Sequence, residues 1–463
     1  MTLRILPRTA ALATCLLAAA CASGGARPSS DAISRLEAER VKSPNSAAAL
    51  RALGIAYYQA QRFPEARDML VAAEQALPND GATSLFRGLT AEAMNDLDGA
   101  RDAYTKYLAV GTSKGTKQQI RDRLAIVQRR ELENTAKSAV SRENELSRVP
   151  GPANTIAVPP LKFTGSDTNL VPLERGIAEL LITDLARSSQ LTVLERERMQ
   201  SLLDEVARGQ SDRVDETTKV RAGKILQAGR IVQGGILQTG PDRIQLTTNV
   251  VIVSTSQTTG SASDDDNLEQ LFALEKKIVF QLFTNLGITL TPEERKLIDD
   301  AKPTRNLKAF LAYSRGLQAE DRGDFSGASR FFDDARGLDP GFNAAGIRAA
   351  GAAAAAAGAN VTSASVQAST AGSREGNAVR AAQQGSLSIN TGGATQVAND
   401  VNASQAANSA SNGQTYSGSG PGGQNTTNGA GGTPSASGTA PAAPTTPLLT
   451  QSGTITFIIR PPE

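Results

Sequence analysis

Only two side chains in the 463-residue sequence carry a thiol, Cys15 and Cys21, and histidine is absent. Without histidine, neither a histidine-dependent catalytic triad nor a histidine-ligated metal site can form. Cys21 ends a short apolar run that begins after Arg4 and Arg8, and three alanines come directly before it. This build is typical of a secretory signal peptide, so residues 1–20 are predicted to be removed. Cleavage there leaves Cys21 as the sole cysteine, which excludes an intramolecular disulfide.

The stretch Leu16–Cys21 resembles the lipobox of bacterial lipoproteins, in which the cysteine sulfur is acylated and becomes the first residue of the mature protein. It departs from that pattern at Ala18, where a leucine is usual. The resemblance predicts lipidation of Cys21, with ordinary signal cleavage and an incidental cysteine as the alternative. Because Ala22 follows, and not an aspartate, the resemblance implies an anchor in the outer membrane with the protein facing the periplasm.

Two runs of charged residues have the composition of sites but are interpreted as structural. Glu195–Arg198 is predicted to start a helix, with glutamates near the positive end of the helix dipole and arginines facing solvent or paired locally. Asp264–Asp266 lacks the spaced ligands and distal glutamate of an EF-hand, so it is predicted to cap the following helix. We therefore predict no catalytic residue, no metal, no cofactor and no enzymatic activity. An acid-dependent hydrolase is the weaker alternative.

Composition limits the partners and divides the chain. With 48 basic and 46 acidic residues, the net charge of +2 gives no electrostatic case for a nucleic-acid partner. Residues 21–40 form a polar linker. Residues 349–447 are rich in Gly, Ser, Ala, Thr, Asn and Gln, and are predicted to be a disordered low-complexity tail. Residues 452–460 are predicted to form a terminal β-strand that adds to a sheet edge, with an incidental apolar tail as the alternative.

Residues 41–137 and 303–347 are predicted to form helical hairpins that resemble tetratricopeptide (TPR) repeats. Small and large residues recur at the spacings of that family, with a 34-residue period between the first two copies. A plain helical hairpin is the alternative for any single copy. The first two copies are expected to pack on a helix over 115–137, and the third on the neighbouring domain. The residues that carry the pattern are Gly54, Tyr57, Ala66, Leu70, Ala73 and Pro78; Gly88, Ala100 and Tyr104; and Gly316, Ala328, Phe332, Ala335 and Pro340.

Residues 153–290 follow a different pattern, with short β-rich runs between amphipathic helical segments. The predicted order is β-α-β-α-α-β-β-α, an α+β sheet with helices on one side. Gly240-Pro241-Asp242 is predicted to be the turn of a hairpin. The strands are expected at 155–158, 191–194, 231–237 and 244–253, and the helices at 172–188, 199–206, 216–228 and 268–286.

This central segment resembles the CsgG family, named for the curli-assembly lipoprotein of the bacterial outer membrane. The motifs that carry the resemblance are Ile156–Val158 with Pro160 and Thr164-Gly165, Gly176–Leu185, Leu191–Arg198, the hairpin after Gly234-Gly235, and Leu286–Ile288. Pro159 stands where an aliphatic residue is usual, so the first strand is expected to be short or to lie at an edge. The resemblance implies ring-type or pairwise self-association.

Pore-forming members of that family add two β-hairpins per subunit, which need roughly forty residues of alternating pattern. Only the hairpin over 231–253 has alternating apolar and polar residues, and the core sheet already needs this hairpin. The sequence therefore favours an outer-membrane-anchored periplasmic lipoprotein that acts as a protein-binding scaffold or assembly component of an envelope or secretion system. It is expected to bind envelope proteins and to form homo-oligomers. The alternative is a subunit of an oligomeric CsgG-type secretion channel.

Overall fold

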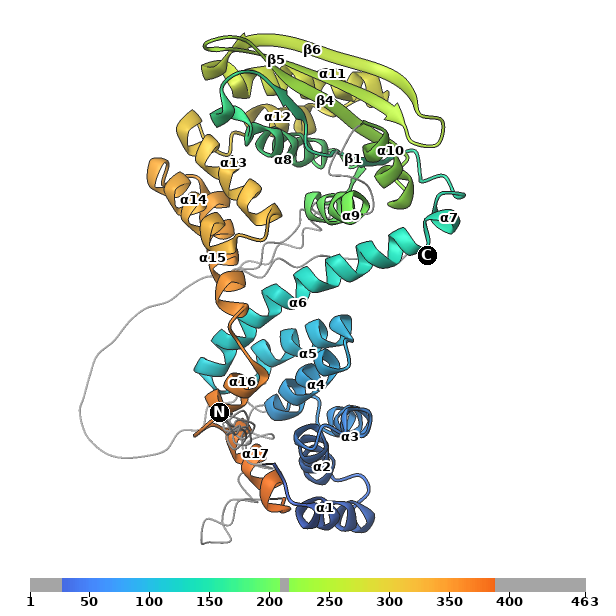
Figure 1. The fold of residues 1–463 in the computed structure, drawn as a ribbon, viewed down its shortest axis with the longest axis vertical. Helices are drawn as coiled ribbons and strands as arrows, with labels where there is room; N and C mark the ends of the chain where they lie inside the picture. The colour runs from blue at the N-terminus through green and yellow to red at the C-terminus, as the bar shows by residue number, and fades with distance from the viewer. Residues whose placement is uncertain (1–26, 209–215, 388–463) are drawn as a thin grey trace, which may run out of the picture. The chain divides into compact units, whose positions relative to one another are not determined.

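The computed structural model describes residues 27–208 and 216–387 (Figure 1). The predicted signal peptide, the lipidation site Cys21 and the predicted strand at 452–460 lie outside the described residues. The chain divides into two compact units. The first takes in the residues up to 131 and those from 354 onward, and the second takes in residues 132–353. Among the described helices, none is long and apolar enough to cross a membrane.

The first unit is helical, and polar side chains mark the starts of its helices. Asp80 accepts a hydrogen bond from the Thr83 amide (2.8 Å), and Asp96 accepts one from the Gly99 amide (3.0 Å), as N-caps do. The helices are α1 (Ser30–Lys42), α2 (Ala47–Gln59), α3 (Phe63–Ala76), α4 (Gly81–Ala93), α5 (Leu97–Val110), the first part of α6 (Lys114–Ser141), the end of α15 (Asn343–Gly358), α16 (Ser363–Ser369) and α17 (Arg374–Gln384).

The same glycine contact joins the two helices in each of three helical hairpins, α2–α3, α4–α5 and α13–α14. The second unit contributes α13 (Leu307–Asp321) and α14 (Phe325–Leu338). In each hairpin a glycine of the first helix lies directly against a large side chain of the second, so that an added Cβ would overlap it. The pairs are Gly54 with Leu70, Gly88 with Tyr104, and Gly316 with Phe332. These are the residues that the sequence pattern aligned, so the predicted hairpins are confirmed in their packing.

The turn inside each hairpin is also repeated. Gln61, Asn95 and Gly323 stand at the same distance after the packed glycines, and all three have a left-handed backbone, with φ of 63°, 60° and 76°. Glutamine adopts this conformation at a cost, whereas glycine does so freely. Ile120, Leu124 and Val127 of α6 join the core of the first unit, as was predicted for the helix over 115–137.

Gly88→Ala should destabilise the first unit by about 1–3 kcal/mol, because its methyl group would overlap the buried Tyr104 ring. The matched control is Gly115→Ala in α6, where an added Cβ meets nothing within 4 Å. That change should be neutral or slightly stabilising, by less than about 1 kcal/mol. Thermal unfolding of the two variants measures the difference, and equal midpoints would contradict the packing.

The second unit is built on one mixed sheet, in the order β3-β1-β4-β5-β6, with β2 paired to β4. The β4–β5–β6 meander is antiparallel, and β1 and β2 run parallel to β4. The strands are β1 (Thr155–Ala157), β2 (Lys162–Thr164), β3 (Thr192–Val193), β4 (Arg230–Gly240), β5 (Arg243–Ile252) and β6 (Gln257–Asn267). The helices are α7 (Glu143–Leu146), α8 (Leu173–Leu185), α9 (Arg196–Arg208), α10 (Glu216–Ile225), α11 (Leu271–Leu286) and α12 (Pro292–Asp300), with short 3-10 turns at Thr168–Leu170 and Leu268–Gln270.

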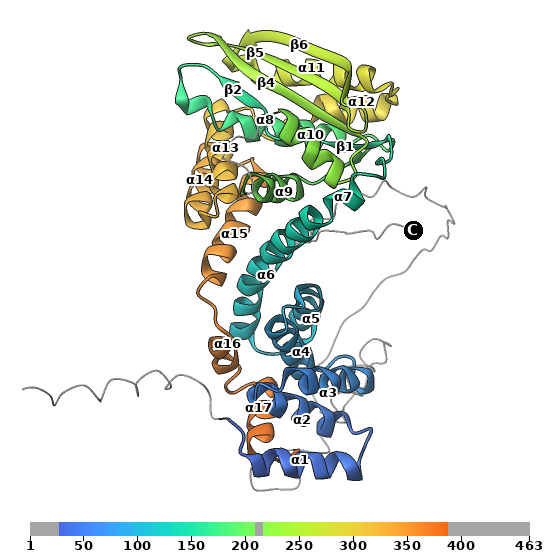
Figure 2. The same cartoon turned by 45° about the vertical axis from the view of Figure 1, so that its right-hand side comes forward.

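Helices cover both faces of part of this sheet, whereas the sequence predicted helices on one side only. Adjacent strand residues point to opposite faces. Val232 packs in the cluster of α8 and α11, and Ile231 packs in the cluster of α9 and α10. Figure 2 shows α11 beneath β5 and β6, and α10 beside β1. The fold class is α+β with flanking helical hairpins, as predicted.

One local prediction for the sheet needs correction, and one is confirmed. Asp264–Asp266 does not cap a helix but forms part of β6, an eleven-residue strand absent from the predicted order. Asp264 and Asp266 lie 3.2 and 3.6 Å from Lys277. The strand before Pro159 was expected to be short or to lie at an edge. It is short, with three residues, and it lies inside the sheet between β3 and β4.

The predicted disordered tail begins too early, because residues 349–384 include the end of α15 and the whole of α16 and α17. Alanine has the highest helix propensity, and its small side chain packs closely against other helices. Ala349 and Ala352 enter the core of the second unit, while Ala378 and Ala382 enter the core of the first. The glycine- and serine-rich composition therefore hid helices that tertiary packing stabilises. The part of the predicted tail from residue 388 lies outside the described residues.

Candidate functional site

A cluster of buried charges lies where the α13–α14 hairpin meets the sheet domain. Gly176 of α8 faces Ser314 of α13 so closely that an added Cβ would overlap the Ser314 hydroxyl. This close approach brings charged residues of four helices together. They are Arg175 and Glu179 of α8, Arg196 and Glu197 of α9, Glu320 and Asp321 of α13, and Arg348 of α15.

Arg196 is the centre of the cluster, with only 4% of its surface exposed. Its Nη1 lies 2.6 Å from Asp321 Oδ1, and its Nε lies 3.4 Å from Glu179 Oε2. Arg348 Nη2 lies 2.9 Å from Glu179 Oε1, and its Nη1 lies 2.9 Å from Glu320 Oε2. The two guanidiniums therefore bind carboxylates from both the sheet domain and the hairpin, and hold the two parts together.

Within the cluster, Glu197 keeps its charge despite its burial. Burial would raise the pKa of Glu197, but the guanidiniums of Arg196 and Arg348 outweigh it and lower that pKa to about 2. Burial raises the pKa of Glu320, against the opposing effect of Arg348 and Arg196. Charges that are this well paired serve a structural purpose, because each guanidinium is already occupied by protein carboxylates.

This finding corrects the interpretation of Glu195–Arg198. Its residues were expected to face solvent or pair locally, yet Arg196 is buried and its partner Asp321 lies 125 positions away in the sequence. The local sequence around Arg196 gave no sign of this pairing, because Asp321 belongs to the helical hairpin that was predicted as a separate domain. An arginine flanked by two glutamates at the start of an amphipathic helix is the only local signal.

A second group of buried charges lies between α8 and α11. Lys276 contacts Asp184 and lies 3.4 Å from Glu275, and Arg187 Nε lies 3.3 Å from Asp184 Oδ1. Burial raises the pKa of Glu275 to about 8, with a further rise from the nearby Asp184 carboxylate. Glu275 therefore keeps its proton at neutral pH, while Asp184 and Lys276 form the ion pair.

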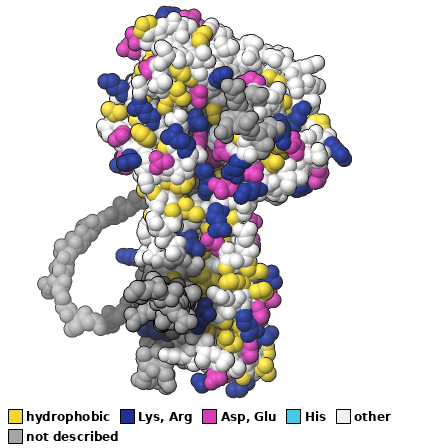
Figure 3. Space-filling model, in the orientation of Figure 1, with side chains coloured by type: hydrophobic (Ala, Val, Ile, Leu, Met, Phe, Trp, Pro, Cys, Tyr) yellow, Lys and Arg dark blue, Asp and Glu magenta, His cyan; other side chains and the backbone are white. Residues whose placement is uncertain are grey.

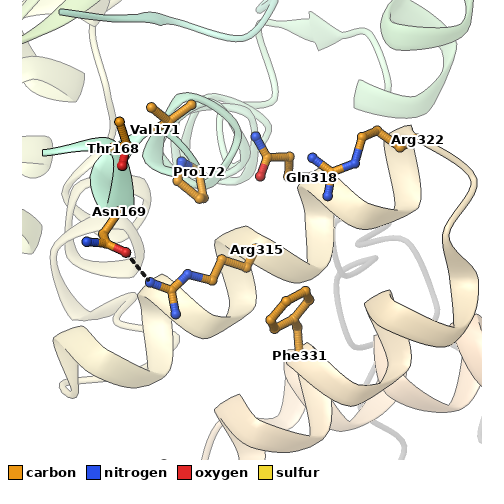
Figure 4. A pocket seen from close by; sticks show the side chains of 8 residues that line it. All are labelled: Thr168, Asn169, Val171, Pro172, Arg315, Gln318, Arg322 and Phe331. Carbon is orange, nitrogen blue, oxygen red and sulfur yellow. Dashed lines mark hydrogen bonds between the residues drawn. The ribbon is translucent and has the colours of Figure 1, made fainter. Parts of the chain in front are cut away.

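Beside the first cluster is an open groove of about 510 Å³, between the start of α8 and the α13–α14 hairpin. Figure 4 shows Arg315, Gln318 and Arg322 on successive turns of α13, with Phe331 of α14 below them. Arg315 donates to Asn169 Oδ1 at 3.4 Å. The eight lining residues include two guanidiniums and no carboxylate: Thr168, Asn169, Val171, Pro172, Arg315, Gln318, Arg322 and Phe331.

The groove has the chemistry of a site for a carboxylate-bearing segment. Guanidinium and amide donors bind carboxylates through charge-assisted hydrogen bonds, and the Phe331 ring with Pro172 supplies an apolar wall. Its sequence signal is the spacing of Arg315, Gln318 and Arg322, which places them on one face of a helix. That spacing was not interpreted as a binding site from the sequence.

Charges of both signs are mixed elsewhere on the surface. In the face drawn in Figure 3, Lys and Arg are interspersed with Asp and Glu, as the near balance of 48 basic and 46 acidic residues leads one to expect. Over residues 27–208 and 216–387, no three acidic or thiol side chains converge as metal ligands would. Cys21 lies outside the described residues.

Residues 148–242 match the model of the family described as curli production assembly/transport component CsgG. The match begins just after α7 and ends at the turn between β4 and β5, so β5, β6 and α11 lie beyond it. It supports the resemblance to the CsgG family for this part of the sheet domain.

Among solved structures, the LpoB C-terminal domain from Salmonella enterica is similar to this chain at 13% identity. The alignment covers 27% of this chain and 94% of that one, with a TM-score of 0.20, and so carries no argument about fold or function. No curated protein matches the chain.

Proposed function

We propose that this chain is an outer-membrane-anchored periplasmic lipoprotein that binds other envelope proteins as a scaffold or assembly component, without enzymatic activity. The observation that carries the proposal is the junction between the CsgG-like domain and the α13–α14 hairpin. The two parts share one hydrophobic core and the buried cluster around Arg196, and the junction presents a groove lined by the side chains of Arg315 and Arg322. A rigid junction of this kind is suited to hold a partner segment in a fixed geometry.

The partner segment is acidic, because its carboxylates complement Arg315 and Arg322 in the groove. Arg315→Glu/Arg322→Glu should abolish its capture, which we would measure in cells with a photo-crosslinking residue at Gln318. The matched control is Arg330→Glu/Arg336→Glu on the exposed face of α14, which reverses the same number of charges outside the groove. Equal crosslinking in both variants would exclude the groove as the binding surface.

The anchor depends on the thiol of Cys21. Cys21→Ala should abolish incorporation of a fatty-acid probe and move the protein from the membrane fraction to the soluble periplasmic fraction. Cys15→Ala is the control, since that residue lies in the segment predicted to be removed. Labelling that persists in the Cys21 variant would rule out lipidation at this site.

The channel alternative has less support in the described residues. The strands β4, β5 and β6 use Val232, Leu246 and Ala262 to cover α8 and α11, so the core of the domain occupies one face of this meander. Self-association through the CsgG-like domain remains a prediction, which the molar mass of the purified protein in light scattering would test.

A further inference from the structure

A helix from later in the chain, α17, covers one surface of the helical hairpins of the first unit. Helix α17 packs against α1, α2 and α4, which are the first helix of the unit and the first helices of its two hairpins. Figures 1 and 2 both show α17 beside α1 and α2, on the side away from α3. We call the surface of α1, α2 and α4 beneath α17 the inner groove.

The contact between α17 and the inner groove is made by small side chains. The buried apolar residues of the helix are Ala378, Val379, Ala381 and Ala382. Each alanine contributes one methyl group, so this interface buries much less apolar surface than the leucines and aromatic residues beneath it. A helix of eleven residues is also marginal by itself in water, and depends on the groove to stay helical.

One carboxylate fixes the direction of the helix in the groove. Glu375, in the first turn of α17, accepts hydrogen bonds from the amide and the hydroxyl of Thr112, both at 2.6 Å. These bonds and the helix N-terminus hold the pKa of Glu375 down against the burial that would raise it. Gly81 stands beside this carboxylate, and an added Cβ there would lie 2.8 Å from Glu375 Oε1. The amide and the hydroxyl of Thr112 are therefore two built donors for an acidic residue at the start of a helix in this groove.

A glycine with a left-handed backbone stands at each end of α17. Gly372 before the helix and Gly385 after it both have a left-handed backbone, with φ of 78° and 69°. The preceding α16 is fixed separately, because Ser369 Oγ donates to Thr116 Oγ1 at 2.9 Å and Ser113 Oγ donates to Ser369 O at 3.2 Å. Two glycine turns thus flank a helix whose buried apolar side chains are small, and this helix follows one that is held by its own hydrogen bonds.

From these contacts we propose that the inner groove is a docking site for a helix of a partner protein, and that α17 is its internal competitor. The partner helix has small apolar side chains on one face and a glutamate or aspartate in its first turn, as α17 has. A partner helix with these features competes with α17 for the groove, so α17 regulates access to it. This surface is separate from the groove around Arg322 and does not depend on lipidation.

A peptide in trans tests the proposal with the full chain. The probe is a fluorescent peptide of residues 371–387, and its binding is followed by anisotropy. The variant Ala378→Asp/Ala382→Asp should release α17 and bind the peptide at least about ten-fold more tightly than the wild type, whose own helix occupies the groove at a high effective concentration. The control Asn377→Asp/Gln384→Asp adds the same charges to the exposed face of α17 and should bind as weakly as the wild type.

A peptide with Glu375→Gln should bind more weakly than the parent peptide, since it lacks the carboxylate that Thr112 binds. Failure of the released variant to bind the parent peptide, with α2 and α4 still helical, would overturn the proposal. So would collapse of the first unit in that variant, because α17 would then be a fixed part of the core.

Native-state hydrogen exchange on the unmodified chain gives an independent measurement. Amides of α17 should exchange at least about ten-fold faster than those of α2 and α4, through local opening of the helix alone. Exchange of all three helices at one common rate would mean that α17 leaves only when the unit unfolds. That result would refute the proposal that a partner helix can displace α17.

Discussion

Replacing Arg196 with methionine is expected to lower the free energy of unfolding of the second unit by about 3–5 kcal/mol, because it leaves buried carboxylates without their counter-charge. Asp321 Oδ1 would lose its 2.6 Å contact, and Glu179 would keep only Arg348. The loss should appear as a lower midpoint in urea unfolding of the full chain. Since Arg196 joins α9 to α13, α13 should also lose hydrogen-exchange protection.

Arg208→Met is the matched control, because it makes the same substitution on the same helix. The Arg208 side chain is 56% exposed and pairs with Glu205 at the surface. Exposed pairs contribute about 1 kcal/mol or less, so this variant should unfold close to the wild type. Equal unfolding midpoints for the two variants would show that the Arg196 cluster does not hold the hairpin to the sheet domain.

Glu275→Gln is expected to stabilise the protein above neutral pH. Burial raises the folded-state pKa of this carboxyl from 4.5 to about 8, so between these values the folded chain holds a proton that the unfolded chain has released. Stability from this group is complete below pH 4.5 and is lost as the pH rises through 8. The loss in the wild type is on the order of 5 kcal/mol, at about 1.4 kcal/mol per pH unit. Glutamine keeps the shape of the protonated side chain and loses no proton.

Thermal unfolding between pH 5 and pH 9 measures this effect. The wild-type midpoint should fall with rising pH, and the Glu275→Gln midpoint should fall less and lie higher at pH 9. Burial also raises the pKa of Asp184, so the midpoint of the Glu275→Gln variant should still fall somewhat as the pH rises. Glu269→Gln, at an exposed glutamate just before the same helix, should follow the wild-type curve. Parallel curves for wild type and Glu275→Gln would contradict the buried protonated carboxyl.

Regular patterns in the sequence predicted most of the elements. The alternation over 244–253 gave β5, and the glycine and aromatic spacing gave the three hairpins. Strand β6 escaped prediction because its core-facing positions are Gly260, Ala262 and Asp264, which carry almost no apolar surface. Its pairing to β5 supplies the stability that its side chains lack.

The site was harder to predict than the fold because it depends on contacts between distant segments. Arg196 acquires its role from Asp321 and Arg348, which approach it only after α8 and α13 have packed. The prediction of disorder for the alanine-rich segment from 349 to 387 was wrong for a related reason. Its composition is that of a disordered chain, and only the grooves that receive Ala352 and Ala382 make it helical.

Strand β6 is the last strand of the sheet, and within the described residues another strand pairs with it on one side only. An outer strand of eleven residues offers a template on which a second copy of the chain can begin a fibril. Asp264–Asp266 protects this template, because its three carboxylates outnumber the two cations that contact them, Lys277 and Arg243. Two such strands meeting side by side would bring like charges together, which disfavours their pairing. The aspartates thus disfavour edge-to-edge pairing between copies of the chain, even where copies are crowded.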